Sequence, residues 1–367
     1  MRSIAVVGVA PAAYPAVAQM VDGDKNHALV HPGHFRVDPF WPKPLPKDPS
    51  TGKYWVTGEV AGTDLDSRDH LFTINRRNLT PTEQREAAPS PAFIVYDRDG
   101  GVANSATPPV LPDGLHGVFV DFEDNVWIGG NADAIVQKYS HDLGTLLLQI
   151  GEKGHFDSSD GTATGTPLNK SHTLLNKPAD VAVDPENGEV YIADGYGNHR
   201  VVVFDKSGKY LRQWGELATL AEARRGVGGK FLKTVHAVNL GKDGLVYVND
   251  RGGDRVQVFE KDGHFVRNIW INKGVGFGNP DNPGTAWDID FSRHDQRLIY
   301  VSDGEEQLVW TVGRRSGRTL TSFGQPGHMA GQFTFVHTLA TDSKGDLYTG
   351  ETIGGRRVQK FRTLGHY

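Results

Sequence analysis

The chain has 367 residues and a formal net charge of -5, with 45 glycines, no cysteine and 10% aromatic residues. The acidic balance argues against nucleic-acid binding, which requires a basic surface to offset phosphate repulsion. The lack of cysteine excludes disulfides and thiolate metal sites, and the sequence has no run of the roughly 18 apolar residues that a membrane span needs.

Two segments precede any regular pattern. Residues 1–18 combine one arginine, a weakly apolar stretch and an Ala-Val-Ala sequence, which is the outline of a secretory signal peptide. This outline predicts a secreted or periplasmic protein; without a working leader the protein would be cytoplasmic. Residues 19–52 predict an extended N-terminal arm, because the proline-rich stretch DPFWPKPLPKDP disfavours regular strand pairing.

From residue 53 to residue 367 the chain is built from six copies of one repeat. Three copies place a histidine at one shared position, in HGVFVDFEDNVWIGGN at 116, HAVNLGKDGLVYVNDR at 236 and HTLATDSKGDLYTGET at 337. The others have Ala61, Ala179 or Trp287 there. Each copy continues into two more apolar runs, so four short strands separated by Asp, Gly and Asn turns are expected. Six such copies predict an all-β fold, a six-bladed β-propeller, since one blade cannot bury its faces alone.

Two details depart from regular repetition. The sixth copy ends soon after its third strand, so we expect an N-terminal segment such as Phe35 to Phe40 to complete that blade. Residues 153–175 are a long polar insertion between the second and third copies, which predicts a loop over one end of the ring. Because ring closure hides most strand edges, a monomer is expected.

His116, His236 and His337 recur in alternate copies. The first strand of each propeller blade lines the central channel, so a residue at its start lies at one mouth of that channel. Three imidazoles that converge there leave one tetrahedral position open, as in a catalytic zinc site. They also suit other divalent metals such as iron, manganese or copper. The alternative is that these histidines only form hydrogen bonds to neighbouring turns.

The residue just past the end of each second strand is expected to lie at the same mouth of the channel as the histidines, because the second strand runs back antiparallel to the first. Arg76 and Arg251 occupy this position in the first and fourth copies, and Tyr196 lies one residue further on in the third. Two arginines beside a metal would neutralise a substrate carboxylate, for which the planar guanidinium is well suited. A tyrosine near a divalent cation and guanidinium groups can act as a general base. We therefore expect a metal-assisted reaction on a small-molecule or peptide substrate with a carboxylate. The alternatives are surface arginines paired with acids such as Asp250, and a rim aromatic.

Other repeated groups have structural interpretations. Asp194, Asp250 and Asp303 end the second strands, where a short carboxylate caps a turn. Trp287 takes the place of a histidine and is expected to fill the channel wall. The large aromatic residues of the second strands are expected to form a packing column, which comprises Trp127, Tyr191, Tyr247, Tyr300 and Tyr348.

The third copy, LNKPADVAVDPENGEVYIADGYGNHRVVVFDKSGKYLRQWGE, resembles an NHL repeat. Over residues 55–363 the chain is similar to the lyase domain of the peptide-amidating system, peptidyl-α-hydroxyglycine α-amidating lyase. The similarity is most specific in LHGVFVDFEDNVWIG, DGYGNHR, VHAV followed by NDR, and FTFVHT.

The resemblance implies cleavage of the C–N bond of a C-terminal α-hydroxyglycine, which releases glyoxylate and a peptide amide. It also implies three zinc ligands, a tyrosine base and two arginines at the substrate, matched here by His116, His236, His337, Tyr196, Arg76 and Arg251. Thr338 stands where the family has an aspartate that helps to bind a structural calcium, so calcium does not carry over. Phe335 stands where the family has a methionine, which would reshape the pocket.

Three functions are consistent with these residues. The first, which we expect, is a zinc-dependent lyase of the amidating type or a relative acting on another α-hydroxy acid derivative. The second is a metal-dependent hydrolase, such as a lactonase, with metal-bound water as the nucleophile. The third is a non-catalytic NHL-type propeller that binds a protein through its rim and holds no metal tightly.

Overall fold

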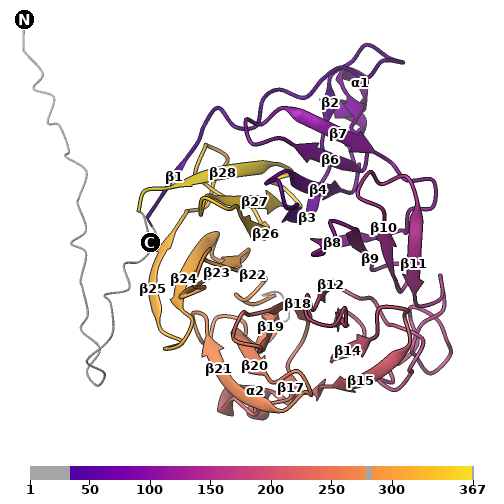
Figure 1. Ribbon diagram of the computed structural model, residues 1–367, viewed down its shortest axis with the longest axis vertical. Coiled ribbons are helices and arrows are strands. Elements are labelled where there is room, and N and C mark those ends of the chain that lie inside the picture. The colour runs from indigo at the N-terminus through magenta and orange to yellow at the C-terminus, as the bar shows by residue number, and fades with distance from the viewer. Residues whose placement is uncertain (1–33, 278–282, 366–367) are drawn as a thin grey trace, which may run out of the picture. The chain divides into compact units, whose positions relative to one another are not determined.

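The computed structural model describes residues 34–277 and 283–365. Over these residues, six four-stranded sheets are arranged around a central axis (Figure 1). Neighbouring strands within each of these sheets run antiparallel. The predicted six-bladed β-propeller is therefore confirmed. The predicted signal peptide, residues 1–18, lies outside the described residues.

In every blade the first strand of the repeat lies nearest the axis (Figure 1). The first blade consists of β3 (Val60–Leu65), β4 (Leu71–Asn75), β6 (Phe93–Tyr96) and β7 (Val102–Ala106). The second consists of β8 (Leu115–Val120), β9 (Val126–Gly130), β10 (Ile135–Tyr139) and β11 (Leu146–Ile150). The third consists of β12 (Asp180–Val183), β13 (Val190–Asp194), β14 (Arg200–Phe204) and β15 (Tyr210–Trp214).

The other three blades repeat this order, with one exception in the last. The fourth consists of β18 (Val235–Leu240), β19 (Val246–Asp250), β20 (Arg255–Phe259) and β21 (Phe265–Trp270). The fifth consists of β22 (Asp288–Phe291), β23 (Leu298–Asp303), β24 (Leu308–Gly313) and β25 (Thr319–Phe323). The sixth consists of β26 (Val336–Thr341), β27 (Leu347–Glu351), β28 (Val358–Thr363) and, from the other end of the chain, β1 (Phe35–Val37).

Short elements fill the connections between strands. Two parallel pairs join β2 (Trp55–Val56) to β5 (Ala88–Pro89) and β16 (Glu216–Leu217) to β17 (Lys230–Phe231). The helices are α1 (Pro81–Glu86), α2 (Leu220–Arg225) and the 3-10 turn η1 (Arg251–Gly253). Both α-helices begin with a threonine and a glutamate that cap each other's backbone N–H groups. None of the helices in the described part of the chain has the length and apolar character that a bilayer crossing requires.

The core lies between the blades, and the second strands supply its largest side chains. The five aromatic residues predicted as a packing column are each at most 1% exposed. Each of them packs into the neighbouring blade; Tyr191 of β13, for example, joins a buried cluster with Val238 and Val248 of the fourth blade. The predicted packing column is confirmed, and it is what fixes one blade against the next.

The ring is closed by strands from both ends of the described chain. β1 pairs antiparallel with β28, with Phe35 opposite Thr363. The Phe35 ring also packs against Tyr300 of the fifth blade, at 5.3 Å between ring centroids. The prediction that the segment from Phe35 to Phe40 completes the sixth blade is confirmed. Part of the arm predicted over residues 19–52 thus belongs to the propeller itself.

Candidate metal centre

His116, His236 and His337 come together at the axis of the ring. One nitrogen of each imidazole lies within 4.8 Å of the other two. The three residues are 3%, 2% and 4% exposed, and their ring centroids are 4.8 to 5.0 Å apart. The sequence prediction that alternate blades bring these residues into one cluster therefore matches the geometry.

A β-bulge stands at each of these histidines. In β26, His337 is the extra residue between two paired neighbours, and β8 and β18 shift register around His116 and His236. β3 is bulged at the same point, whereas β12 and β22 pair regularly with their second strands. A bulge bends a strand and redirects its side chain. The bulges of the three histidine strands explain how residues on separate blades can all turn toward one point.

Hydrogen bonds between blades set the orientation of the imidazoles. Nδ1 of His116 lies 2.7 Å from the carbonyl oxygen of Ala179, and Nδ1 of His236 lies 2.6 Å from that of Trp287. Because a carbonyl can only accept, Nδ1 carries the proton in both residues and Nε2 keeps its lone pair for a metal. The backbone of Ala61, at the equivalent position of the first blade, lies close enough to His337 to raise its pKa, but Nδ1 of His337 forms no hydrogen bond of normal geometry among the described residues.

The histidines are held in the neutral form that metals bind. Burial lowers the pKa of His116 to about 3, helped by the positive charges of Arg76 and Arg251 and opposed by the Ala179 carbonyl. Burial likewise puts the pKa values of His236 and His337 well below the usual range. Three neutral imidazole nitrogens in a pocket that disfavours protonation fit Zn²⁺ or a similar divalent ion.

Tyr196 lies directly against this cluster. It follows β13, and its hydroxyl oxygen is 3.1 Å from Nε2 of His116 and 3.0 Å from Nε2 of His236. Nη1 of Arg251 donates a hydrogen bond of 3.0 Å to the same oxygen. The Tyr196 hydroxyl therefore lies next to the two nitrogens that would face a metal ion in the cluster.

Arg251 is almost fully engaged within the protein. Its Nε donates to the carbonyl of Pro283 at 3.1 Å, and its Nη2 contacts Thr234 Oγ1 at 3.3 Å. The guanidinium carbon also lies 5.2 Å from the ring centroid of Tyr196 and 4.7 Å from that of Trp287. At 7% exposure, Arg251 is a buried cation whose hydrogen bond fixes the position of the Tyr196 oxygen.

Arg76 is the more accessible of the two arginines. Its side chain is 31% exposed, forms an ion pair with Glu59 and donates from Nε to the carbonyl of Leu115 at 3.1 Å. Leu115 directly precedes the first histidine, and the charge of Arg76 lowers the pKa of both His116 and His337. Arg76 therefore places a partly exposed positive charge close to the cluster.

The turn that carries Tyr196 is locked in place by the 153–175 insertion, a feature that repeat comparison missed. Asp157, which is 3% exposed, accepts from Asn198 Nδ2 at 3.1 Å and lies 3.4 Å from Arg200 Nη2. On the other side of the turn, a Cβ atom on Gly195 would lie 2.0 Å from the Val235 carbonyl oxygen. The insertion has no counterpart in the other blades, so stacking the repeats could not reveal this contact.

Asp194 and Asp250 do not cap turns as predicted. Their carboxylates instead form buried ion pairs with arginines on the following strands, Arg200 at 2.9 Å and Arg255 at 2.8 Å. Only Asp303 behaves as expected, since it accepts from the backbone N–H groups of its own turn.

The Arg200→Met variant will lose about 3 to 5 kcal/mol of unfolding free energy, because it leaves Asp194 charged, buried and without its partner. Chemical denaturation followed by tryptophan fluorescence measures the free energy of unfolding of the variant and of the unsubstituted protein. Arg212→Met is the control: its partner Glu189 is partly exposed, so the loss should be about 1 kcal/mol or less. Equal losses in the two variants would contradict the assignment of a buried ion pair beside Tyr196.

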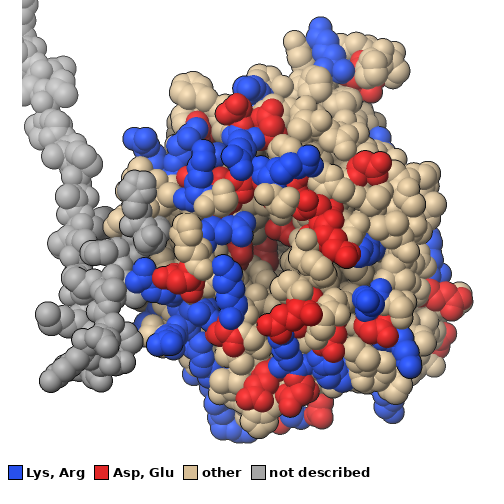
Figure 2. Space-filling model, viewed as in Figure 1, with Lys and Arg blue, Asp and Glu red and all other residues tan. Residues whose placement is uncertain are grey.

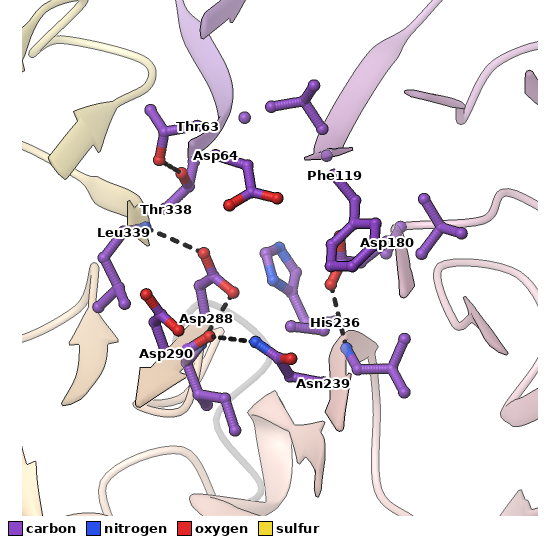
Figure 3. Close-up of a pocket in the computed structure, with 18 of the residues that line it drawn as sticks. Thr63, Asp64, Phe119, Asp180, His236, Asn239, Asp288, Asp290, Thr338 and Leu339 are labelled. Atoms are coloured by element: carbon purple, nitrogen blue, oxygen red, sulfur yellow. Dashed lines mark hydrogen bonds between the residues drawn. The ribbon is translucent and has the colours of Figure 1, made fainter. Parts of the chain in front are cut away.

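On the side of the cluster opposite to Tyr196, the channel opens into a cavity of about 240 Å³. Figure 2 shows the hollow at the centre of one face of the ring, with acidic and basic side chains around it. The close-up in Figure 3 shows His236 pointing into this cavity among four aspartates, Asp64, Asp180, Asp288 and Asp290. Burial raises the pKa of Asp64 to about 7 and those of the other three as well.

The fold and the site define a six-bladed β-propeller with a three-histidine centre on its axis. The family model "NHL repeat" matches residues 175–204, which include β12 to β14. The chain is 28% identical to mouse NHL repeat-containing protein 3 over 349 residues, which cover 89% of this chain and 84% of that protein.

The chain is also similar to proteins of peptide amidation. It is 29% identical to rat peptidylglycine alpha-amidating monooxygenase over 82% of this chain, but this covers only 30% of the rat protein. It is 25% identical to a probable peptidyl-alpha-hydroxyglycine alpha-amidating lyase of Caenorhabditis elegans, over 84% of this chain and 83% of that protein. The chain is thus a six-bladed β-propeller in which one segment matches the NHL repeat model, and it is similar to the amidating lyases.

Solved structures show the same fold. A streptogramin B lyase has a TM-score of 0.55 at 11% identity and covers 90% of this chain and 98% of its own. A Bacteroides thetaiotaomicron protein of unknown function has a TM-score of 0.57 at 13% identity and covers 90% of this chain and 76% of its own. At these identities the likeness concerns the fold alone.

Proposed function

We propose that this protein is a zinc-dependent lyase that cleaves the C–N bond of an α-hydroxyglycine-type substrate into an amide and glyoxylate. The observation that carries the proposal is the Tyr196 hydroxyl, held by Arg251 within 3.1 Å of two neutral histidine nitrogens. A base beside three neutral imidazole nitrogens that could hold a metal is what removal of a proton from a substrate hydroxyl with Lewis-acid assistance would require. The names of the amidating relatives support the same reaction.

His116, His236 and His337 would hold the metal through Nε2. When bound, zinc supplies Lewis acidity toward the substrate hydroxyl. As general base, the Tyr196 oxygen would take the proton from this hydroxyl, and the hydrogen bond from Arg251 would stabilise the negative charge that the oxygen must carry to do so.

The electron pair left on the substrate oxygen forms the carbonyl of glyoxylate as the C–N bond breaks. The departing nitrogen takes the bond's electron pair and the proton that Tyr196 has received, which completes the amide and regenerates the base. Arg76, accessible and close to two of the histidines, would hold the substrate carboxylate, so a small molecule or peptide with that group is the proposed substrate class.

Purified protein will release glyoxylate and benzamide in equal amounts from α-hydroxyhippurate. Release should stop after treatment with a chelator and return when zinc is added, because zinc held by the three histidines would supply the Lewis acidity that the reaction needs. Both products are measured by chromatography, against a blank without protein. Benzoate in place of benzamide would mean amide hydrolysis and would favour the hydrolase. Protein that holds one metal ion per chain but forms neither product would exclude the amidating reaction and keep the metal site.

A further inference from the structure

The inner strands of the propeller have one open edge. Each first strand pairs with its second strand on one side only, so backbone N–H groups on its other side face the channel. Unpaired N–H groups away from bulk water are costly. The channel aspartates of Figure 3 are the acceptors for several of these groups.

Each of these carboxylates joins two blades. Asp288 accepts from Ile289 N in its own strand through Oδ1 at 2.8 Å, and from Leu339 N of the sixth blade through Oδ2 at 3.0 Å. Asp180 accepts from Val238 N of the fourth blade at 3.1 Å. The Asp288 carboxylate thus uses one oxygen in its own regular strand and the other on the bulged strand of the next blade, and we call this arrangement a clamp.

The clamps act close to the metal-site histidines. Val238 lies two residues after His236, and Leu339 lies two residues after His337, immediately past each bulge. A bulge removes the regular ladder that would otherwise fix the strand at that point. The carboxylate of Asp180 or Asp288 supplies an anchor there from the neighbouring blade.

The residues just before these aspartates hold the preceding histidine. The carbonyl of Ala179 orients His116, and the carbonyl of Trp287 orients His236. Ala179 and Asp180 therefore connect the first histidine to the second, and Trp287 and Asp288 connect the second to the third. Each of these two regular strands therefore contacts one histidine through a backbone carbonyl and the strand of the next histidine through a carboxylate.

The first blade holds the strand of His116 in a different way. Gly62 stands where the third and fifth blades have their aspartates, and a Cβ atom there would lie only 2.5 Å from Val118 N. Val118 lies two residues after His116. The backbone of β3 thus packs directly against the strand of His116, which leaves no space for a side chain at this position. The clamp of the first blade lies further along, where Asp64 accepts from Leu65 N at 2.8 Å and from Val120 N at 2.7 Å, four residues past His116.

We propose that Asp180 and Asp288 are positioning residues of the metal site, which fix the bulged strands of His236 and His337 without binding the ion. The inference rests on the metal site of the proposed function, but its readout is the retention of metal. In this inference the third and fifth blades, which carry no metal ligand, hold the ligands of the neighbouring blades in position.

The test compares Asp288→Asn with Asp290→Asn. Asp290 makes the same kind of clamp, from Phe291 N at 2.7 Å to Thr341 N at 2.6 Å, but it anchors the strand four residues past His337. Asparagine has one acceptor oxygen, and its NH₂ group would face one of the two N–H donors, so either substitution breaks a clamp. The two variants should lose similar stability in thermal unfolding of the apoprotein.

Metal content and the rate of zinc loss to a chromogenic chelator are measured for both variants and for the unsubstituted protein. Asp288→Asn should weaken retention by about 10- to 100-fold, as for other groups that support metal ligands, and Asp290→Asn should change it by about threefold or less. Asp180→Asn should match Asp288→Asn, and it decides the question if Asp288→Asn does not fold. Equal retention in the Asp288 and Asp290 variants would overturn the inference and leave the lyase proposal to the glyoxylate assay. No metal in the unsubstituted protein would overturn both.

Discussion

The His236→Ala variant will hold no stoichiometric zinc and will lose lyase activity by about 10³-fold or more, since Lewis-acid catalysis contributes several kcal/mol to the transition state. His236 contacts both other histidines of the cluster and the Tyr196 hydroxyl, so two ligands and the base remain without it. Two ligands bind zinc much more weakly than three. Elemental analysis after dialysis and the benzamide assay measure the two effects.

His264→Ala provides the matched control for this variant. His264 is an exposed residue between β20 and β21 in the same blade, and it has no place in the histidine column. Its substitution should change neither metal content nor activity. The metal site would be disproved if His236→Ala kept one zinc ion per chain, or if both variants lost activity to the same degree.

The Tyr196→Phe variant will keep its zinc but will lose about 10²- to 10⁴-fold in kcat, the usual contribution of a general base. The substitution removes only the oxygen that lies between the two histidines and Arg251. The three imidazoles and Arg76, the residue proposed to hold the substrate carboxylate, stay, so KM should change little. Steady-state kinetics on α-hydroxyhippurate and zinc analysis of the same preparation separate the two effects.

Tyr210→Phe is the corresponding control, because Tyr210 lies in the outer strand β15 of the same blade and stacks on His172. It should behave as the unsubstituted protein does. A Tyr196→Phe variant with unchanged kcat would show that another group takes the proton. Loss of zinc in this variant would instead assign Tyr196 to metal retention.

The repeat pattern predicted the blades, the packing column and the cluster of three histidines because these features recur at a fixed register. His116, His236 and His337 needed only the propeller geometry to be brought together. The closure by β1 was also predictable, since a three-stranded sixth blade would leave an open edge.

What the pattern did not predict depends on contacts between blades. The bulges at the histidines, the carbonyl of Ala179 on His116 and the clamp of Asp288 on β26 involve residues far apart in sequence. The prediction that Asp194 caps a turn was also wrong. Its partner Arg200 lies on the next strand of the same blade, and only the paired sheet brings the two side chains together. Asp157 belongs to a segment that occurs once, so no register pointed to it.

Closure of the ring by β1 has a consequence for how the metal is acquired. The three ligands come from the second, fourth and sixth blades, and the sixth blade is complete only when Phe35–Val37 joins β28. No consecutive half of the ring contains all three histidines, so a chain in which only three blades have formed offers an ion two ligands at most. The full binding energy is then gained only when blades two to six are assembled, and an ion that binds this state shifts the folding equilibrium toward it. A bound metal would stabilise the assembled ring. Its removal should be seen first as separation of β1 from β28, where the two ends of the propeller meet.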